Sequence, residues 1–134
     1  MFDSDVLLDV LLSRQPFVVA STQALDLVPT QQVEGYLAGH AVTNIYYILR
    51  RQLGSRTAHE KLTSLLELVQ VAQVTDQVIR TALQSPMADF EDAVTSAAAN
   101  AINLELIVTR NRSDFALSLV PAIFPEDLVA MISD

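Results

Sequence analysis

The chain has 134 residues, 51% of them hydrophobic, and its sixteen acidic side chains against eight basic ones give a net charge of −8. This length suits one domain with one buried core, residues 1–134. The acidic excess argues against a protein that coats nucleic acid through a broad basic face. No apolar run approaches the roughly 20 residues of a membrane span. Neither cysteines nor a basic leader indicate secretion, so we expect a soluble cytoplasmic protein without a membrane partner.

The first half of the chain predicts helices separated by short strands. Phe2 and Asp3 are expected at the end of a short strand that passes into a helix near Val6, with Asp5 as the helix cap. A further short strand is expected over 34–37. The spacing of apolar residues predicts three more helices, over 17–28, 41–53 and 58–68, the second of them ending at Gly54.

The second half continues the alternation. Short apolar runs predict strands over 71–74, 104–108 and 118–120. Helices are expected over 75–83, capped by Thr75, over 89–102, and from Pro125 onward. Short apolar strands that alternate with helices imply right-handed crossovers, so the pattern predicts an α/β fold with a parallel sheet covered on both faces.

Acidic residues fall where such a sheet binds ligands, at the carboxyl ends of its strands. Asp3 follows the first strand, Asp92 begins a helix with Asp89 and Glu91 beside it, and Asp114 comes shortly after the strand 104–108. Carboxylates that are brought together repel one another unless a cation neutralises them, and hard oxygen ligands suit Mg²⁺ or Mn²⁺. The pattern favours a divalent metal site.

Each acidic residue also has a structural alternative. Asp5 and Asp89 stand immediately before helical runs and are expected to be caps. Asp9 lies one helical turn after Asp5, where it is expected to be solvated or paired with Arg14. Asp92 taken alone would be a solvated acid in the first turn of a helix, and Asp114 taken alone would be a turn former.

The basic residues form two small groups. One contains Arg50, Arg51, Arg56 and Lys61, and the other contains Arg110 and Arg112. Solvated helix and loop surface is the expected role of both groups. With a net charge of −8, any contact with a nucleic acid must be local.

Four segments together resemble a known family. They are Asp3-Ser4-Asp5-Val6-Leu7-Leu8-Asp9, Thr43-Asn44-Ile45-Tyr46-Tyr47, Asp89-Phe90-Glu91-Asp92-Ala93 and Thr109-Arg110-Asn111-Arg112-Ser113-Asp114-Phe115. The sequence resembles the PIN-domain family, close to its VapC-type toxins, over nearly the whole chain. The resemblance implies a three-layer α/β/α fold with a central parallel sheet. It also implies a Mg²⁺- or Mn²⁺-dependent ribonuclease, often one half of a toxin–antitoxin pair and a homodimer.

The resemblance also implies roles for residues. Asp3, Asp92 and Asp114 match three catalytic, metal-binding acids of the family, and Asn44 stands where many members have Glu, the fourth. An amide can coordinate a metal but brings no negative charge, so weakened activity is expected. The matching support and contact residues are Ser4, Asp5, Thr109 and Asn111 in the supporting shell, and Arg110 and Arg112 as phosphate contacts. His40, His59 and Lys61 match no family ligand and are expected at the surface or at helix ends.

Two other functions are compatible with parts of the sequence. Asp3-Ser4-Asp5 suits an aspartyl-phosphate phosphatase, but that class needs a well-placed lysine and a Gly-Asp loop. Here the only lysine is Lys61 and no Gly-Asp occurs. The stronger alternative is a PIN-like interaction module that lacks a competent fourth ligand and acts through a partner protein. The Val-, Leu- and Tyr-rich helical faces also favour a homodimer.

Overall fold

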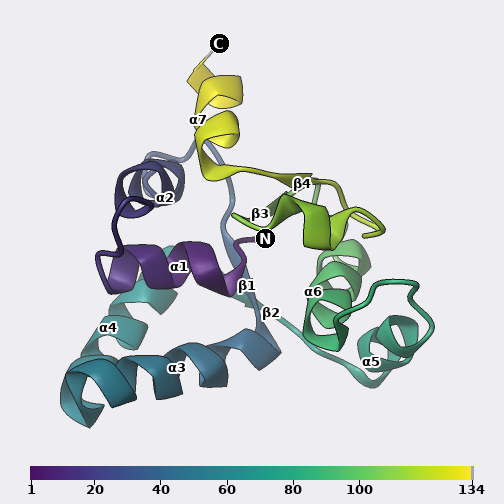
Figure 1. The fold of residues 1–134 in the computed structure, drawn as a ribbon, viewed down its shortest axis with the longest axis horizontal. Coiled ribbons are helices and arrows are strands. Elements are labelled where there is room, and N and C mark those ends of the chain that lie inside the picture. Colours follow the sequence, from purple (N-terminus) through teal and green to yellow (C-terminus); the bar gives the residue numbers. More distant parts are fainter. Residues whose placement is uncertain (134) are drawn as a thin grey trace.

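The computed structural model describes residues 1–133, which form helices around a small central sheet (Figure 1). The helices are α1 (Ser4–Leu11), α2 (Val18–Leu25), α3 (Gly39–Leu53), α4 (Ser55–Leu68), α5 (Asp76–Leu83), α6 (Phe90–Ala101) and α7 (Pro125–Ser133), with a 3₁₀ turn η1 (Arg112–Phe115). The strands are β1 (Tyr36–Ala38), β2 (Gln70–Ala72), β3 (Ile107–Val108) and β4 (Ala122–Ile123). Within residues 1–133, no helix is both long and apolar enough to cross a membrane.

The strands form two parallel pairs that the N-terminal residues join. β1 pairs with β2, and β3 pairs with β4. The Phe2 amide donates to the Tyr36 carbonyl at 2.8 Å, and the Val108 amide donates to the Met1 carbonyl at 2.8 Å. The spatial order is therefore β2, β1, residues 1–3, β3, β4, which confirms the predicted parallel sheet.

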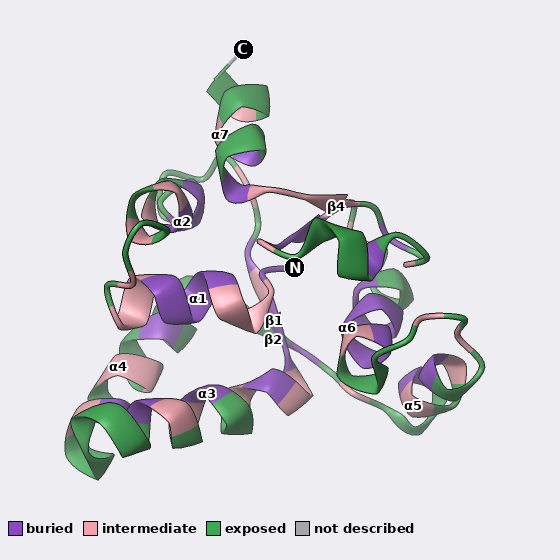
Figure 2. Ribbon diagram, in the orientation of Figure 1, coloured by how far each residue is buried: buried purple, intermediate pink, exposed green. Residues whose placement is uncertain are grey.

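Successive side chains along the strands point alternately into two hydrophobic cores, one on each face of the sheet. Phe2, Leu37 and Val108 pack with α1, α2, α3, α4 and α7, whereas their neighbours Met1, Ala38 and Ile107 pack with α5 and α6. Successive side chains of a strand point to opposite faces, so each short strand supplies both cores. Figure 2 shows the buried residues along the central segments and on the inner sides of α1 and α6. The predicted three-layer α/β/α fold is confirmed.

Two predicted helix caps are confirmed, and Gly54 ends α3 as expected. Thr75 Oγ1 accepts from the Val78 amide at 3.1 Å, and Asp89 Oδ1 accepts from the Asp92 amide at 2.9 Å. Gly54 follows α3 with φ of 86°, a conformation that favours glycine.

The other predicted cap, Asp5, is wrong. The helix begins at Ser4, so Asp3 is the cap, and its Oδ1 accepts from the Ser4 amide at 3.0 Å. Asp5 lies inside the first turn of α1, where the positive end of the helix dipole stabilises a negatively charged carboxylate.

The predicted last strand is also wrong. Residues 118–120 form a bend instead, in which Ser118 Oγ donates to the Val120 carbonyl at 2.7 Å and lies 2.8 Å from the Ser96 hydroxyl oxygen. The apolar residue that suggested a strand, Val120, is buried in the core beside residues of α6. The strand itself, β4, follows at Ala122, and β3 covers only the last two residues of the predicted strand 104–108.

Candidate active site

Asp3 occupies the end of the N-terminal strand segment, where the backbone turns into α1. Its Oδ2 accepts a hydrogen bond from Thr109 Oγ1 at 2.8 Å, while its Oδ1 caps the helix. Burial raises the pKa of Asp3 above its ordinary value, the Thr109 bond opposes that rise, and the charge of Asp92 adds to it. Asp3 is thus a fixed carboxylate that is unfavourable to ionise without a cation.

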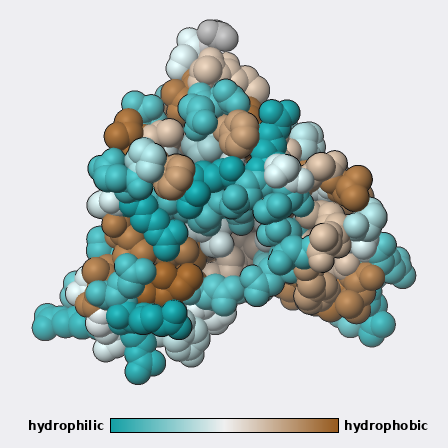
Figure 3. All heavy atoms as spheres, viewed as in Figure 1, coloured by the Kyte–Doolittle hydropathy of each residue, from teal (hydrophilic) through white to brown (hydrophobic). Residues whose placement is uncertain are grey.

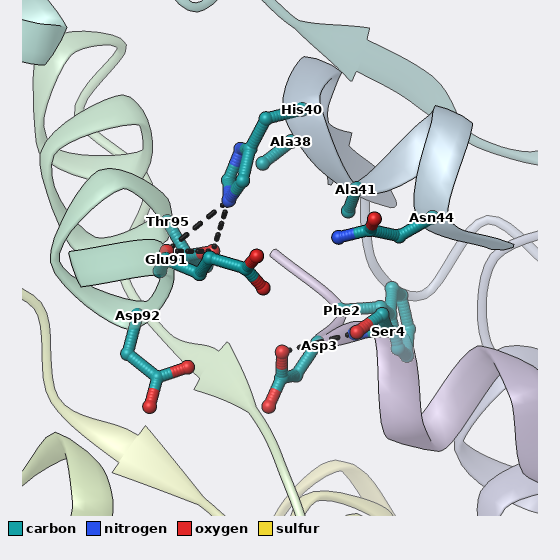
Figure 4. Close-up of a pocket in the computed structure, with 10 residues that line it drawn as sticks. All are labelled: Phe2, Asp3, Ser4, Ala38, His40, Ala41, Asn44, Glu91, Asp92 and Thr95. Atoms are coloured by element: carbon teal, nitrogen blue, oxygen red, sulfur yellow. Dashed lines mark hydrogen bonds between the residues drawn. The ribbon is translucent and has the colours of Figure 1, made fainter. Parts of the chain in front are cut away.

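Asp92 lies across from Asp3, in the first turn of α6. Burial raises its pKa to about 6, and the charges of Asp89 and Asp114 contribute further. In Figure 4 the carboxylates of Asp3 and Asp92 face one another, Asp3 from the residue that caps α1 and Asp92 from α6. Two elements that are far apart in sequence therefore bring two of the predicted catalytic acids together.

A small cleft with a cavity volume of about 30 Å³ opens between these elements and the start of α3. Its lining residues are Phe2, Asp3, Ser4, Ala38, His40, Ala41, Asn44, Glu91, Asp92 and Thr95. The amide of Asn44 points toward the cleft from α3, and the Glu91 carboxylate points toward it from α6 (Figure 4). The cleft thus gathers Asp3, Asp92, Asn44 and Ser4 from the predicted set.

Asp114 does not line this cleft. It lies on η1, and it is close enough for its charge to raise the pKa of Asp92. Asp5 likewise stands beside the cleft: burial raises its pKa to about 6, and the charge of Asp3 adds to the rise. Acidic side chains close enough to affect one another's pKa therefore extend from the start of α1 through α6 to η1.

The loop after β3 binds α1 through three consecutive side chains. Thr109 binds Asp3 as described, and Asn111 Nδ2 donates to Asp5 Oδ2 at 2.7 Å. Between them, Arg110 donates from Nε and Nη2 to Asp9 at 2.7 and 3.2 Å. Thr109 and Asn111 thus each donate a hydrogen bond to an acid at the start of α1, Asp3 and Asp5 respectively.

The structure gives Arg110 and Asp9 roles that the sequence did not indicate. Asp9 was expected to be solvated or paired with Arg14, but it is fully buried and also accepts from Ser21 Oγ at 3.0 Å. A buried carboxylate needs charged and hydrogen-bonding partners, and Arg110 supplies them. The Arg110 guanidinium also lies 3.9 Å from the centre of the Phe17 ring. Asp9 engages two of the five N–H donors of Arg110.

Arg112, the other predicted phosphate contact, lies on η1. Its guanidinium stands 5.8 Å from the centre of the Phe124 ring, a distance typical of a cation–π contact. No ion pair involves Arg112 within residues 1–133.

His40 was expected at the surface or at a helix end; it lies at the start of α3, half-buried, and it lines the cleft. Its Nε2 lies 3.1 Å from the Glu91 carbonyl and 3.4 Å from Thr95 Oγ1, and burial lowers its pKa. Within residues 1–133, its Nδ1 is the buried side-chain polar atom without a hydrogen-bond partner. The spacing from His40 to Asn44, one helical turn, is the signal that would have placed it beside the site. His59, in contrast, is exposed on α4 as expected.

The donor set of the cleft fits a hard divalent cation. Asp3, Asp92 and Asn44 offer only oxygen ligands, and the raised carboxylate pKa values are those of acids that a cation would stabilise in their charged form. Within residues 1–133, no three His, Asp or Glu side chains are grouped closely enough to hold an ion by themselves. Mg²⁺ commonly uses only one or two carboxylates and keeps several waters, so a facing pair of acids suits it.

Comparison with known families gives one match. The family model of the PIN domain matches residues 1–113, from the N-terminal strand segment to the residue before Asp114. The matched part contains the whole cleft and the loop that binds α1. No curated protein matches the sequence.

Proposed function

We propose a function for this chain on the premise that it belongs to the PIN-domain family. In this proposal it is a divalent-metal-dependent ribonuclease that hydrolyses RNA phosphodiester bonds. PIN domains are in general nucleases that use divalent metals, and this membership indicates a nuclease-type function. The observation that carries the finer proposal is the pair Asp3 and Asp92, which face one another across a cleft where burial raises the pKa of both carboxyl groups. Such a pair is suited to a cation and to the phosphate that the cation attracts.

In this proposal Asp3, Asp92 and Asp114 are the catalytic acids and would hold Mg²⁺ or Mn²⁺, with Asn44 as a neutral oxygen ligand. The bound metal would polarise the scissile phosphate and lower the pKa of a water that attacks it, so no protein nucleophile is needed. Thr109 holds Asp3 in place through its 2.8 Å hydrogen bond. Fixed carboxylates lose little conformational freedom on binding, which favours catalysis.

A second candidate is an interaction module with weak or no catalysis. It is favoured by Asn44, which brings no charge to the cleft, and by the lack of three grouped acids within residues 1–133. The aspartyl-phosphate phosphatase has no such support. Its required lysine is not among the residues that line the cleft, and Lys61 lies on α4.

An RNase assay distinguishes the two candidates. The wild-type chain should cut single-stranded RNA when Mg²⁺ or Mn²⁺ is added and stop when EDTA is added. Asp92→Asn should lose this activity, whereas Glu105→Gln, which removes an exposed acid next to β3, should keep it. Metal-independent cleavage, or equal cleavage by Asp92→Asn, contradicts the proposal, and no cleavage by the wild type favours the interaction module.

We extend the proposal to a toxin that pairs with an antitoxin and forms a homodimer, on the resemblance to VapC-type toxins. Expression of the wild-type chain should then arrest growth of the host cell, and Asp92→Asn should not. Light scattering of the purified chain should report twice the mass of one chain. A monomer at working concentration would remove the homodimer from the proposal without affecting the ribonuclease.

A further inference from the structure

Helix α3 carries a polar and aromatic stripe on its exposed side. His40, Asn44, Tyr47 and Arg51 follow one another at spacings of four, three and four residues. At about 100° per residue, these positions fall within about 60° of one another around the helix axis. The buried residues of α3 (Ala41, Ile45 and Leu49) lie on the side that faces the core. The stripe is therefore a surface feature that core packing does not require.

The stripe begins in the cleft and leads out of it. His40 and Asn44 line the cleft, whereas Tyr47 and Arg51 are exposed farther along the helix. With a rise of 1.5 Å per residue, Arg51 stands about 10 Å beyond Asn44, a distance that an extended nucleotide chain covers in very few steps. Figure 1 shows α3 running from the centre of the molecule to the outer end of the arm that it forms with α4.

Tyr47 presents an aromatic ring to solvent next to the site. Its relative exposure is 57%, so more than half of the side chain is open to a ligand. The ring of Tyr46 contacts it edge-on, with centroids 5.4 Å apart and an angle of 75° between the planes. This contact braces the Tyr47 ring and leaves most of it accessible. Exposed, braced aromatic rings are the platforms on which unpaired bases stack.

The arm also differs in charge from the rest of the molecule. Residues 39–68 contain four basic and two acidic residues, a net charge of +2, whereas the remaining residues contain four basic and fourteen acidic ones, a net charge of −10. Arg56 is paired with Glu60, but Arg50 and Arg51 belong to no ion pair within residues 1–133. Figure 3 shows hydrophilic side chains at the outer end of this arm. The arm is thus suited to a polyanion that the acidic cleft alone would repel.

We propose that the exposed side of α3, from Asn44 through Tyr47 to Arg51, binds the single-stranded RNA that flanks the scissile bond. A base stacks on Tyr47, and the Arg51 guanidinium donates hydrogen bonds to a phosphate. The inference rests on the proposed ribonuclease function, since the stripe starts at that cleft. Paired bases hide their faces inside a duplex, so Tyr47 favours unpaired RNA.

Binding of a labelled short single-stranded RNA in EDTA at low salt, followed by fluorescence anisotropy, tests this surface without cleavage. Tyr47→Ala should weaken binding about tenfold, and Tyr47→Phe, which keeps the ring, should restore it. Arg51→Gln should lower the slope of log affinity against log salt by about 0.7, the value for one lost phosphate contact on a single strand. Arg80→Gln removes the same charge from α5 and should leave the slope unchanged. Both Tyr47 and Arg51 are exposed, and a melting curve verifies that each variant is folded.

The outcomes separate this inference from the proposed function. Wild-type binding that depends on Tyr47 and Arg51, in a chain that cleaves no RNA with Mg²⁺ or Mn²⁺, supports the binding surface and overturns the ribonuclease. Cleavage by the wild type with unchanged binding by Tyr47→Ala and Arg51→Gln overturns the surface and leaves the ribonuclease. If the wild type binds no RNA at low salt, the surface is not an RNA site, and a protein partner becomes the occupant to test.

Discussion

The acidic cleft and the α3–α4 arm carry opposite charge, and the molecule holds those charges in different ways. Around the cleft, Asp3, Asp5 and Asp9 are buried or half-buried, and each accepts a hydrogen bond from the loop after β3. On the arm, Arg50 and Arg51 extend into solvent. A buried carboxylate destabilises the folded chain when it is ionised without a partner, whereas an exposed charged side chain changes the free energy of unfolding very little.

This contrast teaches where a substitution acts. Changes around the cleft should alter stability and chemistry together, because the same hydrogen bonds serve both. Changes on the arm should alter only the affinity for a charged partner. Each prediction below tests one side of this difference, and together they run from the largest expected effect to the smallest.

Arg110→Ala should have the largest effect. The substitution leaves Asp9 fully buried without its cationic partner, which typically costs about 3–5 kcal/mol of the free energy of unfolding. Urea unfolding followed by circular dichroism measures this loss. Arg51→Gln, which removes an exposed charge from the arm, is the matched control and should change stability by no more than about 0.5 kcal/mol. Equal effects of the two variants would erase the distinction between cleft and arm.

Thr109→Val should lower activity more than stability. Valine keeps the shape of the buried side chain but cannot donate to Asp3, so the carboxylate loses the bond that orients it. Loss of such a supporting bond typically costs about 10–100-fold in metal affinity or activity. Titration of Mn²⁺ by calorimetry and the RNase assay measure both quantities. Thr109→Ser, which keeps the hydroxyl, should recover most of the activity, and a failure to recover would assign the loss to packing instead.

Asn44→Glu should strengthen metal binding. Asn44 lines the cleft on α3, and a carboxylate there adds a negative charge opposite Asp3 and Asp92. Because attraction between charges at ligand distance is large even when screened, Mn²⁺ affinity should rise by about tenfold and RNase activity should rise with it. Asn44→Ala should lower whatever activity exists. If calorimetry finds the same Mn²⁺ affinity for Asn44→Glu as for the wild type, position 44 is not part of the metal site.

The sequence predicted the fold and much of the cleft for a physical reason. Asp3 directly follows an apolar strand segment, so it stands at the carboxyl end of a parallel sheet. Asp92 was assigned to the same site because it opens a helix and because it matches an acid of the family. Thr109 and Asn111, which the resemblance suggested as supporting residues, hydrogen-bond to Asp3 and Asp5, and their supporting role stays a prediction.

Long-range burial was what the sequence did not disclose. Asp9 sits one turn after Asp5, a spacing that looks like a solvated helix surface, and its partner Arg110 is 101 residues away. The spacing of His40 from Asn44 could have placed it beside the site, but not its partial burial, because the covering contacts come from α6. Val120 looked like a strand residue because a buried bend and a buried strand leave the same apolar pattern. Local patterns report which residues are apolar, whereas tertiary contacts decide which polar residues are covered.

The last prediction concerns the pH dependence of stability, for which Asp92 is the probe. Its pKa in the folded chain is about 6, above the ordinary value of 3.8 that an unfolded chain would show. Between about pH 4 and pH 6 the folded state therefore binds a proton that the unfolded state has released, so the free energy of unfolding falls as the pH rises through this window. The loss is complete above the folded pKa. Because Asp92 is partly exposed, we expect a loss of about 1 kcal/mol, less than the full pKa shift would give.

Asp92→Asn isolates this contribution from that of His40, whose pKa burial lowers and whose effect on stability has the opposite sign. Compared with the wild type, the variant should be about 1 kcal/mol more stable at pH 7 and equally stable near pH 4, as measured by urea unfolding at both pH values. Asp76→Asn is the control, since it removes an exposed carboxylate on α5 that is paired with Arg80, and it should give no gain. Added Mg²⁺ should stabilise the wild type at pH 7 and leave Asp92→Asn nearly unchanged, because the cation relieves the same repulsion that the substitution removes. A difference between the wild type and Asp92→Asn that is the same at both pH values would mean that Asp92 is not strained in the folded chain, and the acidic cleft would then resemble the solvated arm.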